Sequence, residues 1–169
     1  LVRLAKKLKK TGKFTHSKLD PHITQAKFDE LKKNLQTLKT SVQPRLAKEV
    51  KRLALMGDFS ENVEYQLAKG NLRGINQKIL QIEKQIASAQ IIKIKKNSST
   101  IQIGNLVTIE SNKQTLQYRI LGSLETNPTN GTISYQSPLG SQLLNKKVGD
   151  TVEIKLDERI VKYKIIKIE

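Results

Sequence analysis

The stretch that decides how this chain folds is GDFSENVEY at residues 57–65, which places three carboxylates within seven residues. Long runs of regularly spaced apolar residues lie on both sides of it. Glycine followed by aspartate favours a turn, and apolar residues spaced by three and four favour amphipathic helices. The stretch is therefore predicted to be the acidic tip of an antiparallel helical hairpin.

The two runs predict the arms of this hairpin. Apolar residues from Phe28 to Leu53 are spaced by three and four, which predicts one long helix over residues 23–56. Thr24 is expected to cap it, and Pro44 to kink or locally break it, because proline lacks a backbone N–H. The run from Tyr65 to Ala89 keeps the same alternation over three heptads, which is the pattern of a coiled-coil seam.

After a polar linker at residues 95–99 the apolar period changes from helical to alternating. Strands are predicted over residues 101–109, 116–120, 131–135, 152–156 and 160–168. A short helix capped by Ser137 is predicted over residues 138–144. The fold class is therefore α+β: a basic N-terminal tail at residues 1–22, a two-helix coiled-coil finger at 23–96, and an antiparallel sheet domain with one short helix at 97–169.

The charge of the chain favours a polyanionic partner. The formal net charge is +16, and residues 23–96 alone hold 15 basic and 7 acidic residues, a net +8. The tail is expected to be a solvated segment, with a membrane-surface helix and a transit peptide as alternatives. No run approaches a membrane span and cysteine is absent, so the cytoplasm is the expected location.

The acidic tip has two interpretations at this point. Asp58 and Glu61 have the spacing of a capping box, in which both carboxylates satisfy free amides at the start of a helix. Alternatively, the two carboxylates form an incomplete Mg²⁺ site that a partner completes, because Mg²⁺ binds through a few carboxylates together with waters or phosphates. No phosphate loop and no nucleophile, base and orienting acid can be placed together, so an autonomous enzyme is not expected.

Two motifs give the chain a family resemblance. GDFSENVEY at residues 57–65 closely resembles the GDLSENAEY signature of the bacterial transcript cleavage factors GreA and GreB. PLGSQLLNKKVGD at residues 138–150 is similar to the SPIARALIGKKVGD segment of the same family, and the order of finger and sheet domain is also the same. The resemblance covers residues 23–169.

The resemblance implies a mechanism. Family members insert a coiled-coil finger through the secondary channel of backtracked RNA polymerase, while an FKBP-like C-terminal domain docks at its entrance. By this similarity Asp58 and Glu61 would hold a second Mg²⁺ in the polymerase, which then cleaves the 3′ end of its own nascent RNA. The expected protein is a monomeric accessory factor that has no tightly bound cofactor and shares Mg²⁺ with the polymerase.

The resemblance and the charge pattern together assign further residues. The other tip-shaping residues are expected to be Gly57, Phe59, Ser60, Asn62, Glu64 and Tyr65. The candidate RNA or polymerase contacts are Lys48, Lys51, Arg52, Lys69 and Arg73. The candidate polymerase-docking residues of the sheet domain are Pro138, Leu139, Lys146 and Lys147.

The chain departs from the family just before the tip. It has Leu-Ala-Leu-Met at residues 53–56, where family members carry a polar run such as Ala-Arg-Glu-His. Ala54 therefore stands in place of an arginine, for which Lys51 or Arg52 could substitute. This apolar tip would suit a second hypothesis, a non-cleaving regulatory or inhibitory channel binder. A third hypothesis is a basic coiled-coil protein that binds RNA or ribosomes generally.

Overall fold

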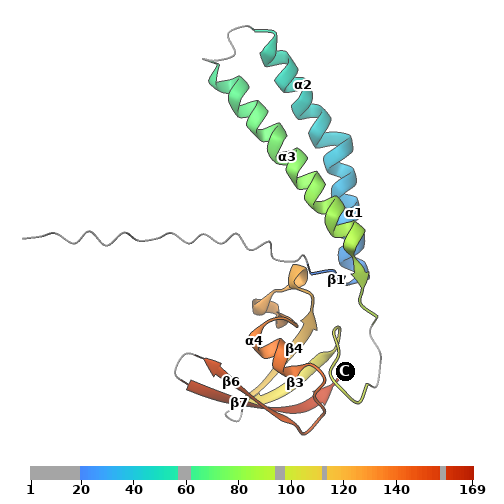
Figure 1. Cartoon of the computed structure of the whole chain (residues 1–169), viewed down its shortest axis with the longest axis vertical. Helices are drawn as coiled ribbons and strands as arrows, with labels where there is room; N and C mark the ends of the chain where they lie inside the picture. The colour runs from blue at the N-terminus through green and yellow to red at the C-terminus, as the bar shows by residue number, and fades with distance from the viewer. Residues whose placement is uncertain (1–19, 57–61, 94–97, 112–113, 157–158) are drawn as a thin grey trace, which may run out of the picture.

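The computed structural model describes residues 20–56, 62–93, 98–111, 114–156 and 159–169. Two long helical arms form a finger that projects from a small sheet domain (Figure 1). This arrangement confirms the predicted α+β class, with a helical hairpin followed by a sheet and one short helix. None of the helices in the described residues is long and apolar enough to cross a membrane.

The first arm is a single helical column with one irregular turn. It consists of α1 (Gln25–Thr37), a π-helical turn (Leu38–Val42) and α2 (Gln43–Ala54). The predicted cap is confirmed, because the Thr24 side chain accepts a hydrogen bond from the Lys27 N–H. The predicted break at Pro44 takes the form of the π-helical turn. A proline ring clashes with the carbonyl four residues earlier, and the wider turn before Pro44 accommodates it without ending the arm.

The second arm, α3 (Val63–Ser88), begins later than a cap at Asp58 would require. Its N-cap is Asn62, whose side-chain oxygen accepts a hydrogen bond from the Tyr65 N–H at 3.0 Å. The proposed capping box at residues 58–61 is therefore wrong as the cap of this helix. Asn62 fills that role because a short amide side chain reaches the amide three residues ahead of it.

The two arms pack along an apolar seam that is most buried near the sheet domain. Its buried residues are Ile23, Leu31, Leu38, Ile79 and Ile82. A short parallel pairing of β1 (His22–Ile23) with β2 (Gln90–Ile91) joins the two arms at this end. The finger is therefore closed at its base by backbone hydrogen bonds as well as by apolar packing.

The sheet domain contains five strands in the order β5-β4-β3-β7-β6. The strands are β3 (Leu106–Ser111), β4 (Gln114–Leu121), β5 (Thr132–Ser134), β6 (Thr151–Leu156) and β7 (Arg159–Ile168). One face of the sheet packs against α4 (Pro138–Leu143), which Ser137 caps as predicted. The buried core is formed by Ile101, Val107, Ile109, Ile120, Leu143, Val152 and Ile165.

The sheet is mixed, which corrects the expectation of a purely antiparallel one. β5 pairs with β4 in parallel, with Arg119 opposite Thr132 and Leu121 opposite Ser134. Two 3₁₀ turns, Ser123–Glu125 and Pro128–Asn130, lie in the connection and return the chain toward the middle of β4 before β5 begins. A tight hairpin would have given an antiparallel pair, because only a longer connection can reverse the chain twice.

Candidate functional site

A buried carboxylate lies where the finger joins the sheet domain. The side chain of Asp20 is 1% exposed, and it accepts hydrogen bonds from the Ser123 N–H at 2.7 Å and the Ser123 hydroxyl at 3.0 Å. The Tyr135 hydroxyl donates to it at 3.1 Å, as does the His22 N–H. Burial opposes ionisation of Asp20, but these hydrogen bonds outweigh it and lower the pKa of the carboxyl. Asp20 therefore links the chain before β1 to two segments of the sheet domain.

A second carboxylate, that of Glu125, connects the sheet domain to the start of α1. Glu125 accepts hydrogen bonds from the Thr24 N–H at 2.7 Å and from the Thr24 hydroxyl at 2.5 Å. Thr24 also caps α1, so the first turn of the finger is held directly by the sheet domain. Between the two carboxylates, Leu124 packs against the apolar seam of the finger.

The close approach of the two units requires a glycine at position 122. A Cβ atom built on Gly122 would lie 1.8 Å from the backbone oxygen of His22, far inside any permitted contact. Any side chain at this position would therefore push the sheet domain away from β1. The contacts made by Asp20, Glu125 and Gly122 together set the direction in which the finger leaves the sheet domain.

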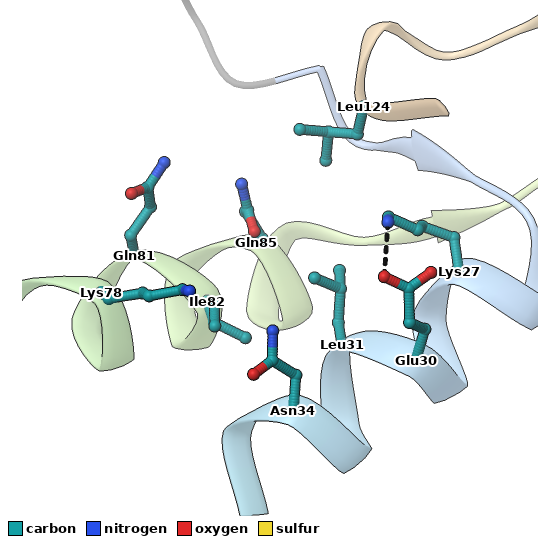
Figure 2. A pocket seen from close by; sticks show the side chains of 9 residues that line it. All are labelled: Lys27, Glu30, Leu31, Asn34, Lys78, Gln81, Ile82, Gln85 and Leu124. Carbon is teal, nitrogen blue, oxygen red and sulfur yellow. Dashed lines mark hydrogen bonds and ion pairs between the residues drawn. The ribbon is translucent and has the colours of Figure 1, made fainter. Parts of the chain in front are cut away.

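A shallow groove lies beside this junction (Figure 2). It encloses about 270 Å³ between α1 and α3, with Leu124 from the sheet domain as part of its wall. Leu31 and Ile82 are its buried members, and Lys27 and Glu30 form an ion pair of 2.8 Å at its rim. Because its one carboxylate is already paired, the groove holds no set of groups for acid–base or metal chemistry. Within the described ranges, no three His, Cys, Asp or Glu side chains are placed to hold a metal ion.

The opposite end of the finger carries the motif. α2 ends at Ala54 and α3 begins at Val63, and both of these helix ends lie at the end of the finger remote from the sheet domain (Figure 1). The predicted metal-presenting residues, Asp58 and Glu61, lie outside the described residues. So do three predicted tip-shaping residues: Gly57, Phe59 and Ser60.

The described part of the tip is unusually apolar for a solvent-exposed surface. The side chains of Leu55, Met56 and Val63 are 81%, 65% and 78% exposed, and Leu67 is 65% exposed. Only Leu53 and Ala68 are buried among the described residues of this region, at 2% and 8% exposure. The last turn of α2 and the first turns of α3 therefore place several large apolar groups in water, which is typical of an interaction surface.

A groove of about 350 Å³ runs between α2 and α3 next to these side chains. Its lining residues are Leu46, Glu49, Leu53, Glu64, Leu67, Ala68 and Asn71. The two carboxylates make it an acidic groove on a strongly basic chain. Three of the predicted tip-shaping residues are described. Glu64 lines this groove, and Asn62 caps α3. The ring of Tyr65 lies below the Lys69 ammonium, which is 5.8 Å from the ring centroid.

The predicted RNA or polymerase contacts are all at the surface of the finger. The exposed set comprises Lys48, Lys51, Arg52, Lys69 and Arg73. Arg52 is held by two hydrogen bonds to Glu49: its Nη2 donates to Oε1 at 2.6 Å and its Nε donates to Oε2 at 3.0 Å. The hydrogen bond and the charge of Glu49, with a smaller contribution from Glu64, raise the pKa of Arg52. Of the two suggested substitutes for the missing arginine, Arg52 is thus already paired within the finger.

The predicted docking residues of the sheet domain differ in exposure. Pro138, Lys146 and Lys147 are exposed, but Leu139 packs against the buried core of the domain. The Lys147 N–H donates to Asp150 at 2.8 Å within a surface turn. Leu139 is therefore better explained by its packing than by docking.

Sequence reasoning missed the junction at the base of the finger. Residues 20–22 were assigned to the tail, whereas Asp20 is buried and His22 belongs to β1. One signal was available, because Asp20 is the only acid in the first 22 residues. Its partners Ser123 and Tyr135 are more than one hundred positions away, so no local pattern connects them to Asp20.

Comparisons with known proteins agree with this architecture. Residues 22–91 match the family model "Transcription elongation factor, N-terminal", and residues 95–169 match "Transcription elongation factor, GreA/GreB, C-term". The chain is 38% identical over 136 residues to the transcription elongation factor GreA of Macrococcus caseolyticus, covering 79% of this chain and 86% of the relative. It is 35% identical over 149 residues to GreA of Nautilia profundicola, covering 86% and 92%.

The likeness to solved structures is weaker. The GreA factor homolog 1 of Thermus thermophilus is 22% identical with a TM-score of 0.40, covering 87% of this chain and 97% of that chain. The family of the chain is therefore assigned from its relatives and from the two family models, and not from the solved structures. The chain belongs to the GreA/GreB family of transcription elongation factors.

Proposed function

We propose that this protein stimulates bacterial RNA polymerase to cleave the 3′ end of its nascent RNA, and so rescues arrested complexes. The observation that carries the proposal is the position of the motif. In the sequence it connects α2 to α3, and the facing ends of these helices, Ala54 and Val63, lie at the end of the finger remote from the sheet domain (Figure 1). A finger held at its base by Asp20 and Glu125 is suited to carrying such a tip into a narrow channel.

The cap at Asn62 supports a functional role for the two tip acids. Because Asn62 satisfies an amide of the first turn of α3, this helix does not need Asp58 as its N-cap. Two carboxylates three positions apart in the sequence of a chain of net charge +16 then need another explanation. Carboxylate oxygens are preferred ligands of Mg²⁺, which commonly binds only one or two of them and leaves other positions to water or phosphate.

In the proposed mechanism Asp58 and Glu61 supply ligands to a Mg²⁺ ion that the polymerase and the RNA also bind. That ion would activate the attacking water and stabilise the leaving oxygen. The protein itself would have no turnover and no tightly bound cofactor, because its two carboxylates are only part of a site. The exposed basic residues of the finger would contribute salt-dependent contacts to RNA phosphates.

Arrested elongation complexes test this proposal directly. Addition of the protein with Mg²⁺ is expected to shorten the radiolabelled RNA from its 3′ end. Asp58→Ala and Glu61→Ala should each lower the cleavage rate by at least about a hundredfold, the scale of losing a group that acts on the transition state. Asp29→Ala, an exposed acid on α1, is the matched control and should cleave at the parental rate.

One observation favours a second function, a regulatory channel binder that does not promote cleavage. The exposed Leu55 and Met56 replace the polar run that precedes the motif in the family. The same experiment separates the two functions. Inhibition of nucleotide addition without RNA shortening would support the second function and contradict the first, whereas binding to any RNA without affinity for polymerase would contradict both.

A further inference from the structure

The exposed apolar side chains of the finger are concentrated at its tip. Among the described residues nine large apolar side chains are exposed, and four of them are Leu55, Met56, Val63 and Leu67. Val63 and Leu67 are four residues apart on α3, so they share one face of that helix. Exposed apolar groups gathered in this way contribute nothing to the fold, and they mark a surface that a partner covers.

The groove beside Leu67 provides a place for such a partner. It encloses about 350 Å³ next to Leu53, which is buried, and Ala68, which is small. Leu46 and Leu67 add further apolar surface to its lining. This combination suits one inserted apolar side chain, because the groove already contains an apolar base and apolar walls.

The charges at its rim decide what kind of partner fits. Both oxygens of the Glu49 carboxylate contact Arg52, so this charge is neutralised within the finger. Glu64 is exposed and has no ion pair with any other described residue. Arg52 lies within reach of both carboxylates, but its hydrogen bonds go to Glu49 and the charge of Glu64 acts on it more weakly. Glu49, Glu64 and Arg52 together therefore leave the groove with one net negative charge beside apolar surface. An RNA phosphate would be repelled by it, whereas an arginine or lysine would be attracted.

We propose that this groove binds a protein segment of RNA polymerase in which an aliphatic or aromatic side chain lies next to an arginine or lysine. The apolar side chain enters between Leu53 and Leu67, and the basic side chain pairs with Glu64. The proposal rests on the proposed function, because delivery into the polymerase brings the two surfaces together. It adds to that function a protein contact on the flank of the tip, separate from the metal-presenting acids.

Binding of variants to core RNA polymerase from the source organism tests the contact. Leu67→Gln should raise the Kd about tenfold, which corresponds to about 1.4 kcal/mol. Glu64→Gln, which keeps the shape and removes the charge, should raise it about threefold. The matched control is Leu80→Gln, which changes another exposed leucine of α3 and should leave the Kd within about twofold of the parent. Circular dichroism should give the same helix content for all three.

A photo-crosslinking residue at position 67 identifies the occupant. Crosslinks from position 67 to a polymerase peptide that contains an apolar and a basic residue, with few from position 80, are expected. Crosslinks to RNA alone, or equal Kd values for Leu67→Gln and Leu80→Gln, would overturn the proposal. These outcomes do not depend on cleavage, so a parent that binds polymerase without shortening RNA would contradict the proposed function only. A parent that fails to bind polymerase would overturn both.

Discussion

The two ends of the finger are built in opposite ways. At the base, the carboxylate of Asp20 is buried and fully hydrogen-bonded, and Gly122 allows two backbones to touch. At the tip, Leu55 and Leu67 are largely exposed to water. Stability is therefore concentrated at the base, while the tip keeps surface that the fold does not use. Such a division suits a protein whose base fixes the direction of the finger and whose tip binds a partner.

The largest expected effect on stability comes from filling the contact at the base. Gly122→Ala would place a methyl group 1.8 Å from the backbone oxygen of His22, so the two segments must separate. We expect a loss of about 3 kcal/mol in the free energy of unfolding, measured by urea denaturation.

The control for this change is another glycine-to-alanine substitution, on the exposed part of the finger. Gly74 lies within α3, and a Cβ atom added to it would meet nothing within 4 Å, so Gly74→Ala should stabilise the protein by about 0.5–1 kcal/mol. If both substitutions changed the free energy of unfolding equally, the base would not be more closely packed around Gly122 than the finger is around Gly74.

Asp20→Asn is expected to have the next largest effect, and this effect depends on pH. The pKa of Asp20 is lowered in the folded protein, so its ionised form stabilises the fold above the usual carboxyl pKa of 3.8. That contribution is lost as the pH falls through the lower pKa of the folded state. We expect a cost of about 2 kcal/mol at neutral pH, because hydrogen bonds to a charged acceptor are replaced by weaker ones.

Hydrogen exchange provides the local measurement for Asp20→Asn. The Ser123 amide, which donates to Asp20, should exchange faster in the variant at neutral pH. The difference in stability between the parent and the variant should shrink as the pH is lowered below 3.8. If the difference in the free energy of unfolding between parent and variant stayed constant from pH 7 to pH 3, the charge of Asp20 would not stabilise the junction between the finger and the sheet domain.

The smallest effect is expected at the tip and concerns the cap of α3. Asn62→Ala should cost about 1 kcal/mol and speed amide exchange in the first turn of the helix. Asp58→Ala should change the free energy of unfolding by less than about 0.5 kcal/mol, although under the proposed function it lowers the cleavage rate by at least about a hundredfold. A larger loss of stability in Asp58→Ala than in Asn62→Ala would restore the capping role of Asp58 and weaken the functional interpretation of the tip.

Much of the fold could be predicted from local patterns. Apolar spacing located both arms, and alternation located the strands of the sheet, because each pattern reports which face of an element is buried. The first strand was predicted to begin at residue 101, but β3 begins at Leu106, after a turn. Thr24 and Ser137 were identified as caps for the same local reason. One of the two interpretations of the tip placed the cap of α3 at Asp58, whereas the cap is Asn62. Several residues in GDFSENVEY have capping side chains, and the spacing alone does not choose among them.

The candidate site was predicted less completely. The motif itself gave Asp58 and Glu61 as functional residues, and these assignments remain predictions. Leu139 was assigned to docking because it lies in a family segment, but its side chain is partly buried and packs against the core of the sheet domain. The groove beside Glu64 was not predicted, because its lining comes from two helices whose relative rotation the sequence does not specify.

By itself, the sequence determined the helical hairpin, the irregularity of its first arm near Pro44, the change to strands after the linker and the place of the acidic motif between the two arms. These features depend on neighbouring residues, whose periodicity and turn chemistry act locally. Only the tertiary structure decided that Asp20 meets Ser123 and Tyr135, that β5 runs parallel to β4, and that Leu67 borders an acidic groove. These features depend on contacts between distant segments, which form only when packing brings those segments together.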